Sequence, residues 1–83
     1  MLIFSQDEKN IINTDTINII EIMNETGENE EINIIKHSIV QARFYNLIVV
    51  LGKYGTEERA KQVLRLLIWN AQVEQKNFKM PKE

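Results

Sequence analysis

The sequence contains no cysteine, one histidine and one proline among its 83 residues. Without cysteine the chain has neither a disulfide to stabilise a small fold nor a thiolate to bind a metal ion. A single histidine also argues against a zinc site built from imidazole ligands. We therefore expect no metal and no cofactor.

The sequence also has no large excess of charge of either sign, since 12 acidic residues nearly balance 10 basic ones and the formal net charge is −2. Proteins that bind the phosphate backbone of nucleic acid usually carry a positive patch, so this balance disfavours nucleic acid as a partner. Long apolar runs are absent as well: Leu47 to Leu51 is far shorter than the roughly 20 residues that span a bilayer. Met1 to Phe4 is too short for the apolar region of a signal peptide. We expect a cytoplasmic location and no membrane partner.

The length of 83 residues corresponds to a single domain. Chains of this size bury only about 60–65% of the surface that their unfolded form exposes, so their stability is marginal. Oligomerisation commonly stabilises such domains when disulfides and metals are absent. We therefore expect a homo-oligomer.

Residues 56–75 carry the pattern of one long amphipathic helix. Neither glycine nor proline interrupts them, and Thr56 is a suitable N-cap, whose hydroxyl can accept a hydrogen bond from the first turn. Glu57 and Glu58 place negative charge at the positive end of the helix dipole. At about 100° per residue, one face gathers the apolar side chains Ala60, Val63, Leu64, Leu67, Ile68 and Ala71. This face is expected to pack on the rest of the fold.

A second apolar group, Leu66, Trp69 and Val73, lies nearly opposite on the same predicted helix. Two interpretations stay open. In the first, the C-terminal tail folds back over this group through Phe78 and Met80. In the second, the group is an interface with another subunit or partner, since contiguous exposed apolar surface marks interaction sites and tryptophan is enriched at their centres. The candidate interface residues are Leu66, Trp69, Val73, Phe78 and Met80.

The first 51 residues are predicted to form short strands separated by polar turns. The strands are expected within residues 2–5, 11–13, 16–23, 32–40 and 45–51. A short helix is the competing interpretation of 16–23, but its isoleucine and threonine content favours a strand. Residues 45–51, YNLIVVL, are almost continuously apolar, which predicts a central strand buried on both faces. Gly52 and Gly55 are interpreted as turn glycines.

The order of these elements predicts an α+β fold in a single domain over residues 1–83. Four to five short antiparallel strands form a meander over 1–51, because parallel neighbours would need long crossovers. A turn follows at 52–55. One long C-terminal helix over 56–75 then packs on the sheet, and residues 76–83 form a mobile tail.

Two groups of polar residues are candidates for chemistry, and each has a simpler structural interpretation. His37 and Ser38 are neighbours on a predicted strand, so their side chains point to opposite faces and cannot form a catalytic pair. An acidic cluster around Gly27 consists of Glu25, Glu28, Glu30 and Glu31. Its spacing does not match a calcium-binding loop, and a solvated turn that deters edge-to-edge aggregation is the preferred interpretation.

Most basic residues of the last third are interleaved with aromatic ones. They are Lys53, Arg59, Lys61, Arg65, Lys76 and Lys79, with Tyr54, Trp69 and Phe78 among them. Such a composition can bind single-stranded nucleic acid by stacking and backbone contacts, although Glu57, Glu58 and Glu74 dilute the charge. No convergent set of titratable groups is visible in the sequence, so we expect no enzyme activity.

Both ends of the chain carry short motifs: MLIFSQD with IIN close behind, then LGKYGTEERAKQVL, then Met80-Pro81. These motifs resemble a group of small proteins from phages and prophages of Gram-positive bacteria, most clearly over residues 1–13 and 51–68. In that group a strand ends in a Leu-Gly-x-Tyr-x-Thr-Glu-Glu-x-Ala pattern, here similar to Leu51 to Ala60, and leads into a C-terminal helix. The resemblance implies the same order of elements and a mobile-element origin, and it supplies no catalytic residues.

Taken together, these features predict a small non-enzymatic protein-interaction module of phage or prophage origin. It would bind a host or phage protein and self-associate. The alternative is a nucleic-acid-binding accessory protein, and a purely structural or assembly component is a third interpretation.

Overall fold

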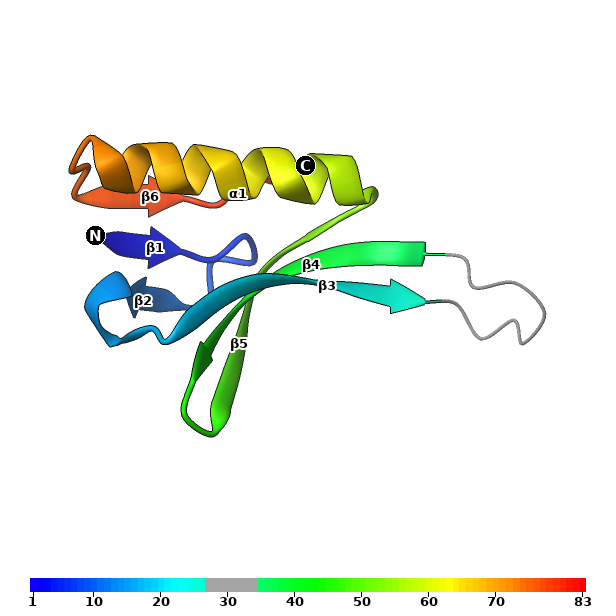
Figure 1. The fold of residues 1–83 in the computed structure, drawn as a ribbon, viewed down its shortest axis with the longest axis horizontal. Helices are drawn as coiled ribbons and strands as arrows, with labels where there is room; N and C mark the ends of the chain where they lie inside the picture. Colours follow the sequence, from blue (N-terminus) through cyan, green and yellow to red (C-terminus); the bar gives the residue numbers. More distant parts are fainter. Residues whose placement is uncertain (27–34) are drawn as a thin grey trace.

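The structure, a computed structural model, describes residues 1–26 and 35–83. Within these ranges the chain forms six strands, one long helix and a short 3-10 helix (Figure 1). The strands are β1 (Leu2–Phe4), β2 (Ile11–Asn13), β3 (Ile19–Thr26), β4 (Ile35–Phe44), β5 (Leu47–Tyr54) and β6 (Asn77–Lys79). The long helix is α1 (Glu57–Gln72), and the 3-10 helix is η1 (Thr14–Thr16). The predicted α+β class is confirmed.

The described strands form two three-stranded sheets instead of one meander. In the larger sheet β3, β4 and β5 are consecutive antiparallel neighbours, as short turns predict. The smaller sheet has the order β2–β1–β6, in which β1 pairs antiparallel with β2 and parallel with β6. The predicted single meander was wrong in this respect, because the N-terminal hairpin pairs with the C-terminal segment and does not continue the larger sheet.

Residues 77–79, expected in a mobile tail, form β6 instead. Phe78 lies opposite Ile3 of β1, and the N–H of Met80 donates to the carbonyl of Phe4 at 2.9 Å. Phe78 and Met80 are both buried, whereas Asn77 and Lys79 are exposed. Apolar side chains at alternate positions are the pattern of a strand with one covered face, so the signal for β6 was present in the sequence.

α1 confirms the predicted helix, although it ends at Gln72 instead of Gln75. Thr56 is the N-cap, and its hydroxyl accepts a hydrogen bond from the N–H of Arg59 at 3.1 Å. Glu74, with φ of 58°, adopts the left-handed conformation that commonly follows a helix end. The predicted end of the helix lay too far toward the C-terminus, because an exposed polar sequence continues past the last helical turn.

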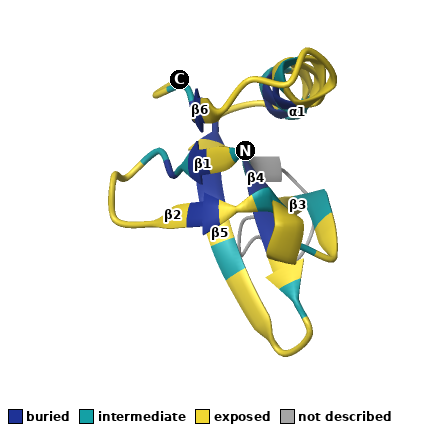
Figure 2. Ribbon diagram, turned by 90° about the vertical axis from the view of Figure 1, so that its left-hand side faces the viewer, coloured by how far each residue is buried: buried dark blue, intermediate teal, exposed yellow. Residues whose placement is uncertain are grey.

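The core lies where α1 and the two sheets meet, and its buried residues are dark blue in Figure 2. α1 contributes Ala60, Val63 and Leu67, the smaller sheet contributes Ile3, Ile12 and Phe78, and the larger sheet contributes Val40, Ala42, Leu51 and Tyr54. β4 is the central strand of the larger sheet and β5 is an edge strand. The prediction that 45–51 forms a central strand buried on both faces was therefore wrong, and Leu47 and Ile48 are 60% and 55% exposed.

Gly52 lies inside β5 and not in the predicted turn at 52–55. The side chain of Tyr54, two residues further along the strand, covers it. A Cβ atom on residue 52 would lie 2.7 Å from the hydroxyl oxygen of Tyr54 and 2.9 Å from its ring. Tyr54 is fully buried, and its hydroxyl donates to the carbonyl of Pro81 at 2.8 Å. Glycine is needed here because any side chain would collide with this ring.

Gln6 joins the N-terminal loop to β5 and to the C-terminal segment. Its side-chain oxygen accepts from the N–H of Lys53 at 2.8 Å, and its Nε2 donates to the carbonyls of Lys53 at 3.0 Å and Pro81 at 3.2 Å. Its backbone N–H donates to the carbonyl of Leu51 at 2.7 Å. Gln6 therefore bonds to the edge of β5 as a residue of an additional strand would.

Replacing Gly52 with alanine is expected to lower the free energy of unfolding by about 1–3 kcal/mol, the usual cost of overpacking. The matched control is Gly55→Ala, whose Cβ would meet only the Glu83 side chain at 3.7 Å, and its expected effect is within about 0.5 kcal/mol. Urea denaturation followed by circular dichroism measures both. Equal stability of the two variants would contradict the role assigned to Gly52.

The stability of the fold is expected to fall at high pH because of Tyr54. Burial raises the pKa of Tyr54 to about 12. The unfolded chain therefore loses this proton first, near its ordinary pKa of about 10, and is favoured as the pH rises further. The stabilisation of the fold that results from the raised pKa of Tyr54 is complete below about pH 10 and is lost progressively between about pH 10 and pH 12. Urea midpoints measured across this range should fall more steeply in the wild type than in Tyr54→Phe, and identical slopes would rule out this cause.

Candidate functional site

The outward face of α1 carries the three residues that we call the helix surface: Leu66, Trp69 and Val73. They are 44%, 61% and 44% exposed. The polar side chains Arg59, Gln62 and Arg65 join Leu66 and Trp69 around a shallow hollow of 370 Å³. Helical periodicity predicted this group, and in the structure its three side chains are exposed to solvent.

Phe78 and Met80, the other two candidate interface residues, do not belong to this surface. They are 9% and 4% exposed and are part of the core that α1 covers. The interpretation in which they cover the helix surface is wrong, because they are buried elsewhere while Trp69 remains 61% exposed. Their assignment to an interface is corrected for the same reason.

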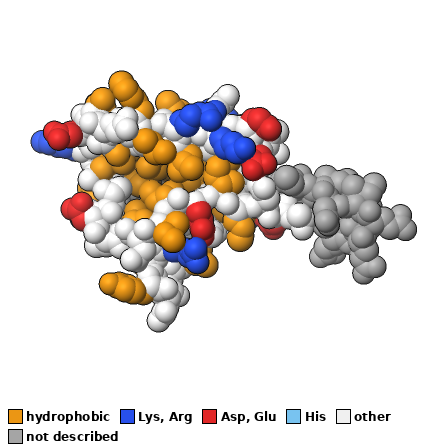
Figure 3. All heavy atoms as spheres, viewed as in Figure 1, with side chains coloured by type: hydrophobic (Ala, Val, Ile, Leu, Met, Phe, Trp, Pro, Cys, Tyr) orange, Lys and Arg blue, Asp and Glu red, His pale blue; other side chains and the backbone are white. Residues whose placement is uncertain are grey.

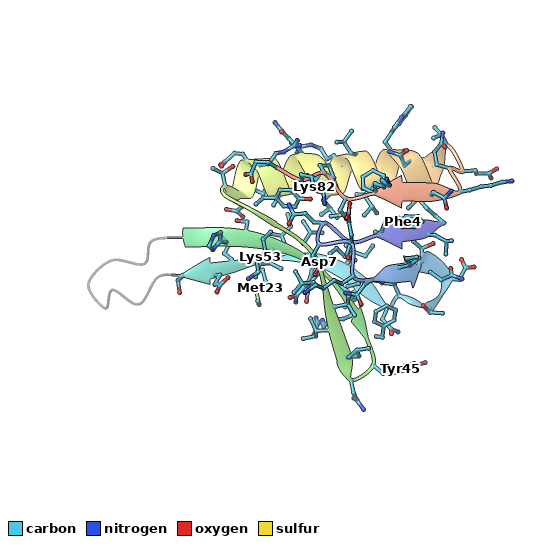
Figure 4. All side chains as sticks on the ribbon, turned by 180° about the vertical axis from the view of Figure 1, so that it is seen from behind. Phe4, Asp7, Met23, Tyr45, Lys53 and Lys82 are labelled. Atoms are coloured by element: carbon cyan, nitrogen blue, oxygen red, sulfur yellow. The ribbon has the colours of Figure 1, made fainter. Side chains whose placement is uncertain are left out.

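The β4–β5 hairpin carries a second exposed apolar group that the sequence interpretation missed. Tyr45 at its tip is 95% exposed, and Leu47, Ile48 and Val50 on β5 are 60%, 55% and 39% exposed. The hairpin projects from the body on the side away from α1 (Figure 1), and Tyr45 points out from its tip (Figure 4). We call these four residues the hairpin surface. An apolar run has the same pattern in a central strand and in an edge strand, which is why the sequence did not reveal it.

Tyr45 occupies a strained backbone conformation. It lies in the two-residue turn between Phe44 and Leu47 and has a φ of 29°. Its N–H donates to the side-chain oxygen of Asn18 at 3.2 Å, which ties the tip to the start of β3. Bulky residues at positive φ cost energy and are concentrated at functional sites. A tyrosine that is strained and almost fully exposed therefore contributes little to the fold, and its side chain is available to a partner.

Apolar side chains also gather on the face shown in Figure 3, between α1 and the larger sheet. Ile17, Ile20 and Ile22 are partly buried and pack against the core. Ile68, predicted to face the core, is 47% exposed. We interpret the three partly buried isoleucines as an extension of the core.

The candidate catalytic residues do not form a catalytic arrangement. Nδ1 of His37 lies 3.9 Å from the carboxylate of Glu25, and Nζ of Lys53 lies at the same distance from it. Ser38 is buried and donates its hydroxyl hydrogen to Asn24 at 2.7 Å. Glu28, Glu30 and Glu31 of the acidic cluster lie outside the described residues. Among the residues that are described, no three His, Cys, Asp or Glu side chains are placed to hold a metal ion.

A hollow of 320 Å³ opens between the loop of residues 5–10 and the C-terminal segment. The hydroxyl of Ser5 donates to Asp7 at 2.6 Å, and this hydrogen bond lowers the pKa of the Asp7 carboxyl. Glu8 and Lys82 form an ion pair at 3.3 Å. These contacts close the loop and tether the C-terminal segment, so their role is structural.

The six basic residues of the last third differ in how far other groups engage them. Three of the six are engaged with acidic residues or backbone: Lys53 lies 3.9 Å from Glu25, Lys61 lies 3.8 Å from Glu57, and Nε of Arg59 donates to the carbonyl of Glu83 at 2.8 Å. Arg59 and Arg65 both line the hollow beside Trp69. The helix surface therefore combines an apolar centre with a partly basic rim.

Comparisons of the chain with protein-family models, curated proteins and solved structures found no match. The resemblance to phage and prophage proteins therefore stays a prediction. Within residues 1–26 and 35–83, no helix is both long and apolar enough to cross a membrane.

Replacing Tyr45 with asparagine is expected to raise the free energy of unfolding by up to about 1 kcal/mol, because asparagine tolerates positive φ better. Little packing is lost, since the tyrosine is 95% exposed. Urea denaturation measures the change, with Asn46→Ala as a control in the same turn. A loss of more than about 1 kcal/mol in Tyr45→Asn would show that the tyrosine supports the fold.

Proposed function

We propose that this protein is a small non-enzymatic interaction module that self-associates through the helix surface and binds a partner protein through the hairpin surface. The observation that carries the proposal is the exposure of Trp69, with Leu66 and Val73 beside it, on the side of α1 turned away from the core. Exposed contiguous apolar surface with a polar rim is typical of interaction sites, and tryptophan is the residue type most enriched at their energetic centres.

Self-association suits the helix surface because its apolar centre is self-complementary. The three residues are spaced three and four apart, so they form one stripe along α1. In a two-fold dimer the same patch from each copy faces the other, and uncharged stripes can pack together as ridges and grooves of helices do. The limited core of an 83-residue chain favours such additional burial.

The hairpin surface remains accessible in such a dimer. α1 and the hairpin lie on opposite sides of the molecule (Figure 1), so packing two helices together leaves both hairpins facing outward. The hairpin is therefore the better contact for a host or phage protein. A phage or prophage origin and a cytoplasmic location are part of this proposal, and the terminal motifs and the absence of cysteine support them.

Nucleic-acid binding is the alternative function. The presence of Arg59 and Arg65 beside Trp69 favours it, because a base can stack on an indole while guanidinium groups contact phosphate. The net charge of −2 and the pairing of Lys61 with Glu57 weaken the field that such binding needs. We therefore favour the protein-interaction function.

Replacing Trp69 with glutamate is expected to convert the self-associated wild type to a monomer. A charge buried at the centre of the contact costs about 2 kcal/mol or more, so the association constant should fall by more than tenfold. Size exclusion with light scattering measures the mass over a range of concentrations. The matched control is Met23→Glu, which places the same charge on β3 at a residue that is 47% exposed. A wild type that is monomeric at every concentration would contradict self-association. A Trp69→Glu variant that stays oligomeric would show that the subunit contact lies outside the helix surface.

A further inference from the structure

We propose that the hairpin surface binds an extended, uncharged segment of the partner protein, which pairs as an additional strand with the open edge of β5. This inference rests on the proposed function and names the kind of partner contact that the hairpin makes. Strand addition to a sheet edge is a general mode of peptide recognition, in which main-chain hydrogen bonds supply affinity and alternate side chains supply specificity.

Part of the β5 edge is open. β5 is an edge strand of the larger sheet, and Phe44 and Leu47 pair across the two-residue turn. The two residues that flank such a turn form a hydrogen-bonded pair. Along the strand, hydrogen-bonded pairs then alternate with pairs that are not hydrogen-bonded to each other. The backbone N–H and C=O groups of Leu47 and Val49 therefore face β4, and those of Ile48 and Val50 face away from the sheet.

Further along β5, the same edge is already bonded in a strand-like manner. The backbone N–H of Gln6 donates to Leu51, and its side-chain amide bonds to both backbone groups of Lys53. Gln6 thus occupies the edge from Leu51 to Lys53 as a short strand would. Residues 48–50, where the hairpin projects from the body, are left free of these hydrogen bonds. Another extended segment can pair with them.

The open edge of β5 also lacks charge. Edge strands are usually protected from pairing by charged residues, proline or coverage. Between Arg43 and Lys53 the chain contains no charged residue and no proline. The opposite edge strand of the same sheet, β3, carries Glu21 and Glu25. The unprotected edge of β5 suits an uncharged segment, because Ile48 and Val50 carry no charge and Arg43, opposite Ile48 on β4, is already paired with Glu21 at 2.9 Å.

The occupant is a different protein and not a second copy of this chain. The helix surface already supplies a self-complementary contact in the proposed function. A second self-complementary contact on the same chain would join dimers to one another and build larger assemblies. A foreign strand on β5 leaves the dimer closed and places the exposed ring of Tyr45 beside the bound segment.

The test uses a probe peptide of alternating threonine and valine with lysines at both ends, which is extended, soluble and uncharged at its centre. Backbone amide exchange, observed by nuclear magnetic resonance, reports on each amide of β5. Without peptide, the amides of Ile48 and Val50 are expected to exchange about tenfold or more faster than those of Leu47 and Val49. Saturating peptide is expected to slow the first pair about tenfold and to leave the second pair unchanged.

Two variants make the test specific. Ile48→Lys is expected to weaken peptide binding about tenfold, because lysine on an edge strand opposes pairing. Its matched control is Met23→Lys, which is similarly exposed and lies on the same face of the larger sheet, two strands away. The Trp69→Glu variant is expected to bind the peptide as the wild type does, so a failure of self-association and a failure of strand pairing give separate results.

Three results would overturn the inference. The first is unchanged exchange at Ile48 and Val50 at saturating peptide. The second is equal weakening of peptide binding by Ile48→Lys and Met23→Lys. The third is protection of Ile48 and Val50 that rises with protein concentration in the absence of peptide, which would assign the edge of β5 to a second copy of the chain.

Discussion

The closure of the Tyr54 ring over Gly52 is the contact on which the arrangement of this fold depends. The ring is fully buried in the core, and its hydroxyl holds the carbonyl of Pro81. The C-terminal segment held in this way brings Phe78 into the core and places β6 beside β1. The side chain of Tyr54, from the larger sheet, thus holds β6 in position as the third strand of the smaller sheet. Gln6 adds a second connection between the same parts, because it bonds to both Lys53 and Pro81.

Local signals predicted the elements whose formation is local. Thr56 and the two glutamates after it mark the start of α1. Of the predicted core-facing stripe, Ala60, Val63 and Leu67 are buried, whereas Ile68 and Ala71 are exposed. The parallel pairing of β1 with β6 could not be predicted in this way, since the alternation of Phe78 and Met80 indicates a strand but not its partner across nearly the whole chain. Gly52 was misinterpreted because the reason for a glycine there is the ring of Tyr54, a contact that composition alone does not reveal.

The two exposed surfaces differ in how far the sequence predicts them. On a helix the angular spacing of residues fixes which ones share a side, so Leu66, Trp69 and Val73 were identified correctly as one group. On a strand, continuous apolar residues indicate burial on both faces only if the strand is central. Strand order decides that question, and the order β3–β4–β5 places Leu47 and Ile48 at an edge. The hairpin surface therefore follows from topology and not from the residues of β5 themselves.

The irregularity in β5 explains how one strand serves both the core and an exposed hairpin. Val40 pairs with Gly52 and Gln41 pairs with Val50, so Leu51 is an extra residue without a direct partner on β4. A bulge of this kind bends the strand and increases its twist. After the bulge, Gly52 and Tyr54 are buried in the body, whereas before it Ile48 and Val50 remain exposed. An uncharged edge exposed in this way would ordinarily promote aggregation. Its restriction to the few residues between the hairpin tip and the bulge limits that risk and leaves a short segment for a partner strand.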